Sequence, residues 1–337
     1  MVQGDEAAVA RETEAEAAAN VRAVLQLCAA GKLRASEKTQ RPAAATVAVV
    51  ASPMAGGDFY DAEPIAAFAW PLLLQAGGLA ELAGGRLQLT ARGRTALSKP
   101  AAATIKDLWR RWISGGVIDE FSRVEEIKGQ RIKNVLTAAK PRRQKVAAAL
   151  ALCEPGEWVE VDDLFAVMRR NGLDPLIART ERGLWRLYLV DPEYGSLGYA
   201  GFADWPILEG RYTLAVLFEY AATLGLVDVR YEEPEGARSD YHRNWGADDL
   251  KRLSRYDGLR AVRLNALGAY VLGMSPAYEP APVAVEQVLK VLPNFDVVVT
   301  GGLAAVDRLT LDGYAARTSD RVWTLSRKAV KSLGYVF

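Results

Sequence analysis

Two stretches of the chain share a pattern that constrains the fold more than any single residue does. An apolar helical run ends at Gly78 and precedes residues 87–93, and a second run ends at Gly225 and precedes residues 262–268. Both following segments read apolar-x-Leu-Thr/Asn-x-x-Gly. A helix that ends at glycine, then a polar hairpin and a closing strand, is typical of the end of a winged-helix domain. The repeat predicts an α+β fold, predominantly helical, with tandem winged helices.

Length and linkers predict the domain order. A chain of 337 residues is too long for one core, so we expect several domains. A proline-rich linker follows residue 275, and residues 184–190 have the composition of a strand. The expected order is a winged helix at 1–100, a basic helical connector at 101–140, a degenerate winged helix at 141–200, a third winged helix at 201–275, and a small α/β module at 283–337.

Cysteine usage and hydropathy indicate a cytoplasmic protein. Cys28 and Cys153 both lie in apolar helical runs, and the chain shows no secretory leader, so we expect two buried free thiols rather than a disulfide. The most apolar stretch, residues 64–80, is interrupted by Pro71 and falls short of the roughly 20 residues that a membrane span needs. We therefore expect no membrane partner.

Catalytic residue sets are missing from the sequence. The only histidine is His242, which we interpret as a surface residue, and there is no phosphate-binding loop of the Gly-x-x-x-x-Gly-Lys-Ser/Thr type. Acidic pairs occur at residues 162–163 and 248–249, where helix starts explain them through capping and the backbone dipole. We expect no enzymatic activity, no cofactor and no metal.

A basic segment is the most functional-looking feature. Residues 86–145 hold fifteen Lys or Arg against five acids, although the whole chain has a net charge of only +1. In winged helices, Lys and Arg near the second and third helices and the wing hold phosphates. Trp109 and Trp112 flank Arg110 and Arg111, and are either core residues or partners for bases. The residues that we expect to contact the DNA backbone are Lys38, Arg41, Arg86, Arg92, Arg94, Arg110, Arg111, Lys128, Arg131, Lys133, Arg142, Arg143 and Lys145.

That basic segment also has simpler interpretations. Its charges are explained equally by a solvated face, or by pairing with the acidic residues among positions 1–20. No motif indicates a particular base sequence, so DNA contact remains a hypothesis at this point.

The tail resembles a known family. Residues 291–299 and 316–326 resemble the helicase-associated domain at the N-terminus of XPB-type DNA helicases, and residues 253–273 are similar to the winged helix that precedes it in bacterial helicase-associated proteins. Motor motifs of helicases are absent, so the resemblance implies an accessory part of a DNA-processing system, in repair or in defence against foreign DNA, with a helicase or other DNA-processing subunit as partner. Because the family module continues with more helices, we expect a truncated module or a fragment of a longer protein.

These observations favour a non-enzymatic DNA-binding or helicase-associated adaptor. Two rival interpretations remain: a protein-interaction scaffold whose winged helices make no DNA contact, and a winged-helix transcription regulator.

Overall fold

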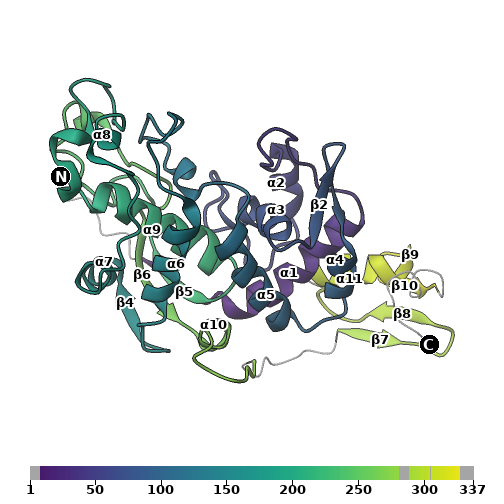
Figure 1. The fold of residues 1–337 in the computed structure, drawn as a ribbon. Coiled ribbons are helices and arrows are strands. Elements are labelled where there is room, and N and C mark those ends of the chain that lie inside the picture. Colours follow the sequence, from purple (N-terminus) through teal and green to yellow (C-terminus); the bar gives the residue numbers. More distant parts are fainter. Residues whose placement is uncertain (1–7, 281–287, 304, 327–337) are drawn as a thin grey trace, which may run out of the picture. The chain divides into compact units, whose positions relative to one another are not determined.

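Four antiparallel strands that are far apart in the sequence form one sheet, in the order β1-β5-β6-β4. The computed structural model describes residues 8–280, 288–303 and 305–326 (Figure 1). These residues fold into two units: unit 1 contains residues 8–14 and 113–277, and unit 2 contains residues 15–112 and the described part of 278–337. The α+β class that the sequence predicts is confirmed.

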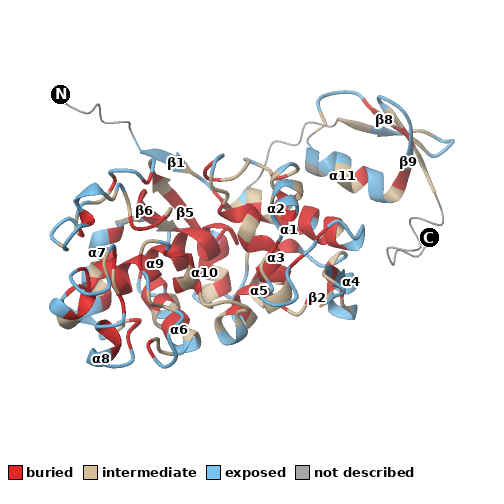
Figure 2. Cartoon of the chain, turned by 90° about the horizontal axis from the view of Figure 1, so that it is seen from above, coloured by how far each residue is buried: buried red, intermediate tan, exposed pale blue. Residues whose placement is uncertain are grey.

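Unit 1 is built on that four-stranded sheet. β5 (Val227–Tyr231) and β6 (Leu259–Leu264) form its centre, and the edge strands are β1 (Val9–Arg11) and β4 (Trp158–Glu160). Its helices are η1 (Glu120–Arg123), α6 (Ala139–Leu150), α7 (Val161–Arg170), α8 (Glu181–Leu184), η2 (Leu197–Tyr199), η3 (Gly201–Ala203), η4 (Pro206–Gly210), α9 (Arg211–Ala215), η5 (Val216–Ala222), η6 (Ala247–Asp249) and α10 (Ala266–Leu272). The run η4-α9-η5 is continuous and almost wholly buried, because its residues are mostly apolar on every side (Figure 2).

Unit 2 contains a helical part and a separate small sheet. Its helical part holds α1 (Glu14–Ala29), α2 (Ala44–Ala51), α3 (Ala66–Ala76), α4 (Ala91–Ala96), α5 (Ala101–Gly115), and the hairpin of β2 (Ala80–Ala83) with β3 (Arg86–Leu89). α3 is well capped, because the Asp58 carboxylate accepts hydrogen bonds from the backbone N–H groups of Ile65, Ala66 and Ala67 at 2.8–3.0 Å.

The tail forms its own small α/β module. It contains β7 (Leu289–Val291), β8 (Asp296–Val299), α11 (Ala305–Tyr314), β9 (Ala315–Ser319) and β10 (Val322–Leu325), with strand order β7-β8-β10-β9. Trp323 is 1% exposed and packs with Val297, Val299 and Leu311 as the core. These elements are the described part of the α/β module that the sequence predicts at 283–337, and residues 327–337 lie outside the described residues.

The sequence repeat corresponds to the same local structure in both units. At the end of α3, Leu79 N–H donates to the Leu74 carbonyl and Gly78 has φ +65°; after η5, Leu226 N–H donates to the Ala221 carbonyl and Gly225 has φ +72°. This is the Schellman ending, in which glycine adopts the left-handed conformation at no steric cost. Each segment begins with the closing strand that the pattern predicts, and these strands, β3 and β6, end at Leu89 and Leu264.

The residue after each strand begins a helix. Thr90 Oγ1 accepts a hydrogen bond from Gly93 N–H at 3.1 Å, and Asn265 Oδ1 accepts one from Gly268 N–H at 2.9 Å. The repeated Leu-Thr/Asn-x-x-Gly pattern is therefore the N-cap of α4 and of α10.

The expected domain boundaries differ from the observed units. β4, from the predicted second winged helix (141–200), pairs with β6, from the predicted third (201–275), with Trp158 opposite Arg263. Those two segments share one sheet and belong to one unit. The predicted connector (101–140) is divided between the two units. Residues 101–112 belong to unit 2, where α5 buries Ile105, Leu108 and Trp112, and residues from 113 onward belong to unit 1.

Smaller predictions were also corrected by the fold. Residues 184–190 are not a regular strand: α8 ends at Leu184, and the following chain makes only isolated bridges at Tyr188.

Within the described residues, no helix combines the length and apolar character that crossing a lipid bilayer requires. Cys28 and Cys153 are buried free thiols, as predicted.

Candidate nucleic-acid interface

Two of the predicted DNA contacts are buried structural residues. Arg142 is 1% exposed and its guanidinium donates to Asp119 at 3.0 and 2.5 Å, while Arg143 is 2% exposed and its Nε donates to Glu120 at 2.9 Å. A guanidinium that is enclosed and already bonded to a carboxylate has no surface left for a phosphate. The prediction that Arg142 and Arg143 contact DNA is wrong for this reason.

The pair of Glu120 and Arg143 belongs to a buried polar network. Glu120 is fully buried and also accepts a hydrogen bond from the Tyr212 hydroxyl at 3.3 Å. Burial raises the pKa of Glu120 to about 7, although the neighbouring Arg143 guanidinium opposes the rise. These charges belong to the interior of unit 1 and are not part of a surface patch.

The remaining basic residues are divided between the two units. Lys128, Arg131, Lys133 and Lys145 belong to unit 1, whereas the other predicted contacts belong to unit 2. In unit 1, Lys128 Nζ lies 3.4 Å from Glu126 and Lys145 Nζ donates to the Gly172 carbonyl at 2.6 Å. Arg131 and Lys133 are exposed, and no acid lies within ion-pair distance of either in the described part of the chain.

A second group, on α4 and α5 of unit 2, is partly neutralised. Asp107 lies between Arg92, at 3.8 Å, and Arg110, at 3.1 Å. Arg94 Nη1 donates to the Leu89 carbonyl at 2.8 Å, and Arg111 is half-buried. Trp109 and Trp112 are core residues with ring centroids 5.1 Å apart, so they present no surface to bases.

The third group surrounds the β2-β3 hairpin and contains uncompensated charge. Arg86, at the start of β3, lies directly opposite Arg34 in an isolated antiparallel bridge. The flanking backbone bonds run from Leu87 N–H to the Leu33 carbonyl and from Ala35 N–H to the Gly85 carbonyl. Arg34 and Arg86 are therefore a non-hydrogen-bonded pair, the type whose Cα atoms approach to about 4.5 Å.

Among the described residues, no Asp or Glu side chain lies within ion-pair distance of Arg34 or Arg86. Both are exposed, and like charges directly opposite each other on a sheet are destabilising. Lys38 is exposed in the neighbouring turn, and Arg41 is half-buried there. Sequence reasoning missed Arg34, because only its bridge to Arg86 shows that it belongs to this group. We call the four residues Arg34, Lys38, Arg41 and Arg86 the hairpin cluster.

Local hydrogen bonds fix the backbone of the hairpin cluster. Thr46 Oγ1 accepts from Arg34 N–H at 2.7 Å and donates to the Arg34 carbonyl at 2.8 Å. Glu37 Oε1 accepts from Gly85 N–H at 2.5 Å, so this carboxylate is bonded to the hairpin tip rather than to an arginine. The cluster therefore presents its charges from an ordered backbone.

The helix before the hairpin is unsuited to reading bases. α3 has the sequence Ala-Ala-Phe-Ala-Trp-Pro-Leu-Leu-Leu-Gln-Ala and buries eight of its residues, including Trp70. It carries no Lys or Arg, and Gln75 donates to the Gln40 and Pro71 carbonyls. Base recognition in the major groove needs polar side chains on an exposed helix, and α3 presents no such face.

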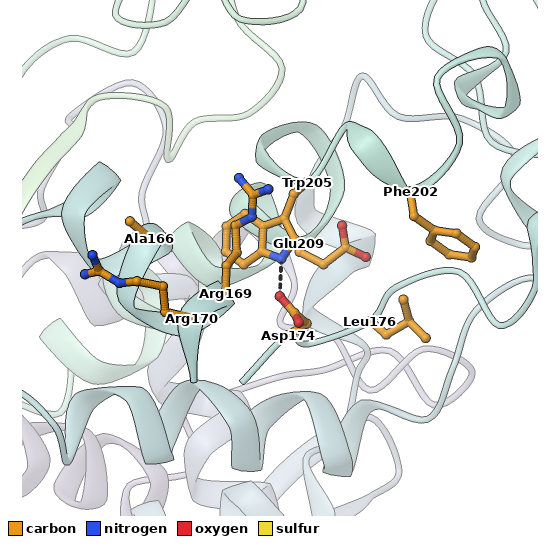
Figure 3. A pocket seen from close by; sticks show the side chains of 8 residues that line it. All are labelled: Ala166, Arg169, Arg170, Asp174, Leu176, Phe202, Trp205 and Glu209. Atoms are coloured by element: carbon orange, nitrogen blue, oxygen red, sulfur yellow. Dashed lines mark hydrogen bonds between the residues drawn. The ribbon is translucent and has the colours of Figure 1, made fainter. Parts of the chain in front are cut away.

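A cavity in unit 1 was not foreseen from the sequence. It has a volume of about 610 Å³ and is lined by Ala166, Arg169, Arg170, Asp174, Leu176, Phe202, Trp205 and Glu209 (Figure 3). Trp205 Nε1 donates to Asp174 Oδ1 at 2.6 Å across it. Nothing in the local pattern around Phe202 distinguishes an exposed aromatic residue from a core one, so the sequence carried no signal for this site.

Comparison with known proteins gives no family for the chain. No protein-family model, no curated protein and no solved structure matches it. The resemblance of the tail to helicase-associated proteins therefore rests on its own residues. Within the described residues, no three His, Cys, Asp or Glu side chains gather as metal ligands.

Proposed function

We propose that unit 2 binds the phosphate backbone of double-stranded DNA through the hairpin cluster, as a non-enzymatic part of a DNA-processing system. The observation that carries the proposal is the Arg34–Arg86 pair: two exposed arginines face each other at the closest cross-strand position, without a described acidic partner. Such a pair costs stability in the free protein, and a bound phosphate would relieve the repulsion.

The order of elements supports a winged-helix interpretation. Unit 2 runs α1, a bridge strand at Arg34, α2, α3, β2 and β3; unit 1 runs α6, β4, α7, the helical run 206–222, β5 and β6. In each unit the first strand of this order pairs with the last. This is the order of a winged helix, and in that fold the hairpin is the wing that lies along the DNA backbone.

The adaptor role rests on the tail. The segment Ser319-Asp320-Arg321 makes the tight turn between β9 and β10, and Trp323 of β10 anchors the core of the module. These are the residues that resemble the helicase-associated domain, so we propose a helicase or another DNA-processing subunit as the partner. A transcription regulator fits less well, because α3 presents no base-reading side chains.

Single charge reversals test the proposal. Arg34→Glu and Arg86→Glu each place a carboxylate opposite an arginine, so the fold should hold, and Arg22→Glu is the matched control because Arg22 is exposed on α1. Binding to two unrelated duplexes would be followed by fluorescence anisotropy across a salt series. A variant that no longer neutralises one phosphate should show a slope of log affinity against log salt that is smaller by about 0.9.

The outcomes separate the rival functions. Equal weakening for both duplexes, with Arg22→Glu unchanged, supports backbone binding. Weakening for only one duplex would mean base readout and would favour a regulator. Unchanged affinity in folded variants would assign the hairpin cluster to a protein partner, as in the scaffold interpretation.

A further inference from the structure

The cavity in unit 1 has chemically different ends. Figure 3 shows Arg170 and Ala166 at one side, Phe202 and Leu176 at the other, and Glu209 between them. Its volume of about 610 Å³ lies within the range of about 300–1,000 Å³ that is usual for small-molecule sites. The cavity can therefore hold a ligand that is charged at one end and flat and apolar at the other.

Two arginines on the last turn of α7 supply the positive charge of the cavity: the Arg170 guanidinium lies on the Ala166 side, and the Arg169 guanidinium lies beside Trp205 (Figure 3). Arg169 and Arg170 are both exposed, and neither has an acid within ion-pair distance among the described residues. Guanidinium groups bind phosphate oxygens bidentately, so each of the two arginines can hold one phosphate. These two arginines are suited to anions.

The opposite end is apolar and open to solvent. Phe202 is 52% exposed and Leu176 is 42% exposed, although both are of types that folding normally buries. Aromatic rings in this setting offer a face for stacking a planar ligand.

Glu209 adds a polar group between the two ends. Its side chain comes from η4, is 4% exposed, and accepts a hydrogen bond from Ile177 N–H at 2.9 Å through Oε1. The carboxyl group points toward the Phe202 side (Figure 3). Burial raises the pKa of Glu209 to about 7, so near neutral pH this group can accept or donate a hydrogen bond.

More aromatic rings are exposed on the same unit. Trp185 and Tyr199 are 46% and 63% exposed with ring centroids 4.9 Å apart, and Tyr194 and Trp245 are 55% and 56% exposed with centroids 5.3 Å apart. Tyr199 lies only three residues before Phe202. Arg182 and Arg186 flank Trp185 and have no ion-pair partner among the described residues. Interleaved aromatic and basic side chains are the usual surface for a single strand, whose bases are free to stack.

We infer that the unit 1 cavity binds one nucleotide of a single-stranded nucleic acid, with successive backbone phosphates at Arg169 and Arg170 and the base against Phe202. A nucleotide supplies the anion, the planar face and the hydrogen-bonding edge in one unit. A duplex does not fit, because its bases are stacked inside. The exposed rings at Trp185 and Tyr199 would then receive neighbouring bases.

This inference rests on the proposed function only for the class of ligand. The hairpin cluster and the cavity belong to different units and share no residue, so separate variants test each of them. A duplex probe reports on the first and a single-stranded probe on the second.

Arg170→Glu and Phe202→Ala test the site, because both residues are exposed and neither change removes core packing. The matched controls in the same unit are Lys140→Glu, on α6, and Leu152→Ala, which is 56% exposed. Fluorescence anisotropy would use labelled 12-mer single strands of DNA and of RNA, the matching duplex, and competition by a free nucleoside monophosphate. Stacking on one aromatic side chain contributes about 1–3 kcal/mol, so Phe202→Ala should weaken single-strand binding about tenfold or more.

We expect both variants to weaken single-strand binding, the controls to leave it unchanged, and duplex binding to persist in all four. Competition by the free nucleotide would indicate a mononucleotide site, and preference for one 12-mer would identify DNA or RNA as the ligand. Equal affinity of wild type and folded variants for the single strand would overturn the inference. Absence of any single-strand binding by the wild-type protein would also overturn it and would assign the exposed aromatic residues to a protein partner. A wild-type protein that binds the single strand but not the duplex would refute only the hairpin proposal.

Discussion

Arg143 and Glu120 form an ion pair that is almost completely enclosed, with Arg143 Nη2 2.8 Å from Glu120 Oε1 and with 3% and 0% of their side chains exposed. Arg143 Nη2 also donates to the Ile118 carbonyl at 2.9 Å, which ties α6 to the segment before η1. Gly116 lies against this guanidinium, where an added Cβ would be 2.4 Å from Arg143 Nη2. The pair therefore organises the start of unit 1.

Removing one member of this pair should be costly. Arg143→Met leaves Glu120 buried without its cation, and breaking a buried pair in this way typically costs about 3–5 kcal/mol. The double variant Glu120→Gln/Arg143→Met should recover part of the loss, because no charge then remains buried at that position. Urea denaturation of the four proteins of the cycle gives the coupling; additive losses would mean that the two side chains act independently.

Gly93 and Gly268, the last residues of the two repeated segments, should not tolerate a side chain. A Cβ at Gly93 would lie 2.0 Å from the Leu79 carbonyl oxygen, and a Cβ at Gly268 would lie 2.0 Å from the Leu226 carbonyl oxygen. Because backbone cannot move aside cheaply, Gly93→Ala and Gly268→Ala should each cost about 1–3 kcal/mol or more. Gly115→Ala is the control, since nothing lies within 4 Å of its added Cβ. Thermal unfolding of all three would check this, and a Gly268→Ala protein as stable as wild type would contradict the equivalence of the two segments.

Local features of the fold were predictable from the sequence, and non-local ones were not. The glycine at 225 and the capping residue Asn265 act on neighbours within a few residues, so their pattern is visible in one dimension. The pairing of Trp158 with Arg263 joins strands that are distant in the sequence, and no local signal shows that they share a sheet. This is why one unit was interpreted as two domains.

In the candidate sites, too, single residues could be predicted from the local sequence, whereas their burial and their partners depend on the fold. Charge counting found Arg86 but also included Arg142, because the sequence does not show that Asp119 lies beside it. Arg34 was missed because its membership depends on the bridge to Arg86. Phe202 was missed because an aromatic residue is more often buried, and only the fold reveals which ones are exposed.

Neutralising one arginine of the hairpin cluster should stabilise the protein while weakening DNA binding. Arg34→Gln or Arg86→Gln removes the cross-strand repulsion, and such pairs contribute about 0.2–1 kcal/mol. The gain should shrink as salt is added, because screening already reduces the repulsion between exposed charges. Chemical denaturation at low and high salt would measure it, with Arg22→Gln as the reference. A loss of stability in both variants would show that the two guanidinium groups do not repel each other.

Glu209 should make the stability of unit 1 depend on pH. Burial raises its pKa from 4.5 to about 7, so the folded state binds a proton more tightly than the unfolded state does. The contribution is fully present below about pH 4.5 and is lost as the pH rises toward 7 and above, and a shift of this size corresponds to about 3 kcal/mol.

Glu209→Gln removes the titrating group and keeps an oxygen to accept from Ile177 N–H. The difference in unfolding free energy between the variant and the wild-type protein should therefore grow in favour of the variant as the pH is raised from the ordinary carboxyl pKa of 4.5 to above 7. The nearby Asp174 carboxylate contributes to the raised pKa of Glu209, so Asp174→Asn should reduce the pH dependence without abolishing it. A difference that stays constant across this range would mean that Glu209 has the same pKa in the folded and unfolded states and that its carboxyl group is better hydrated than its 4% exposure indicates.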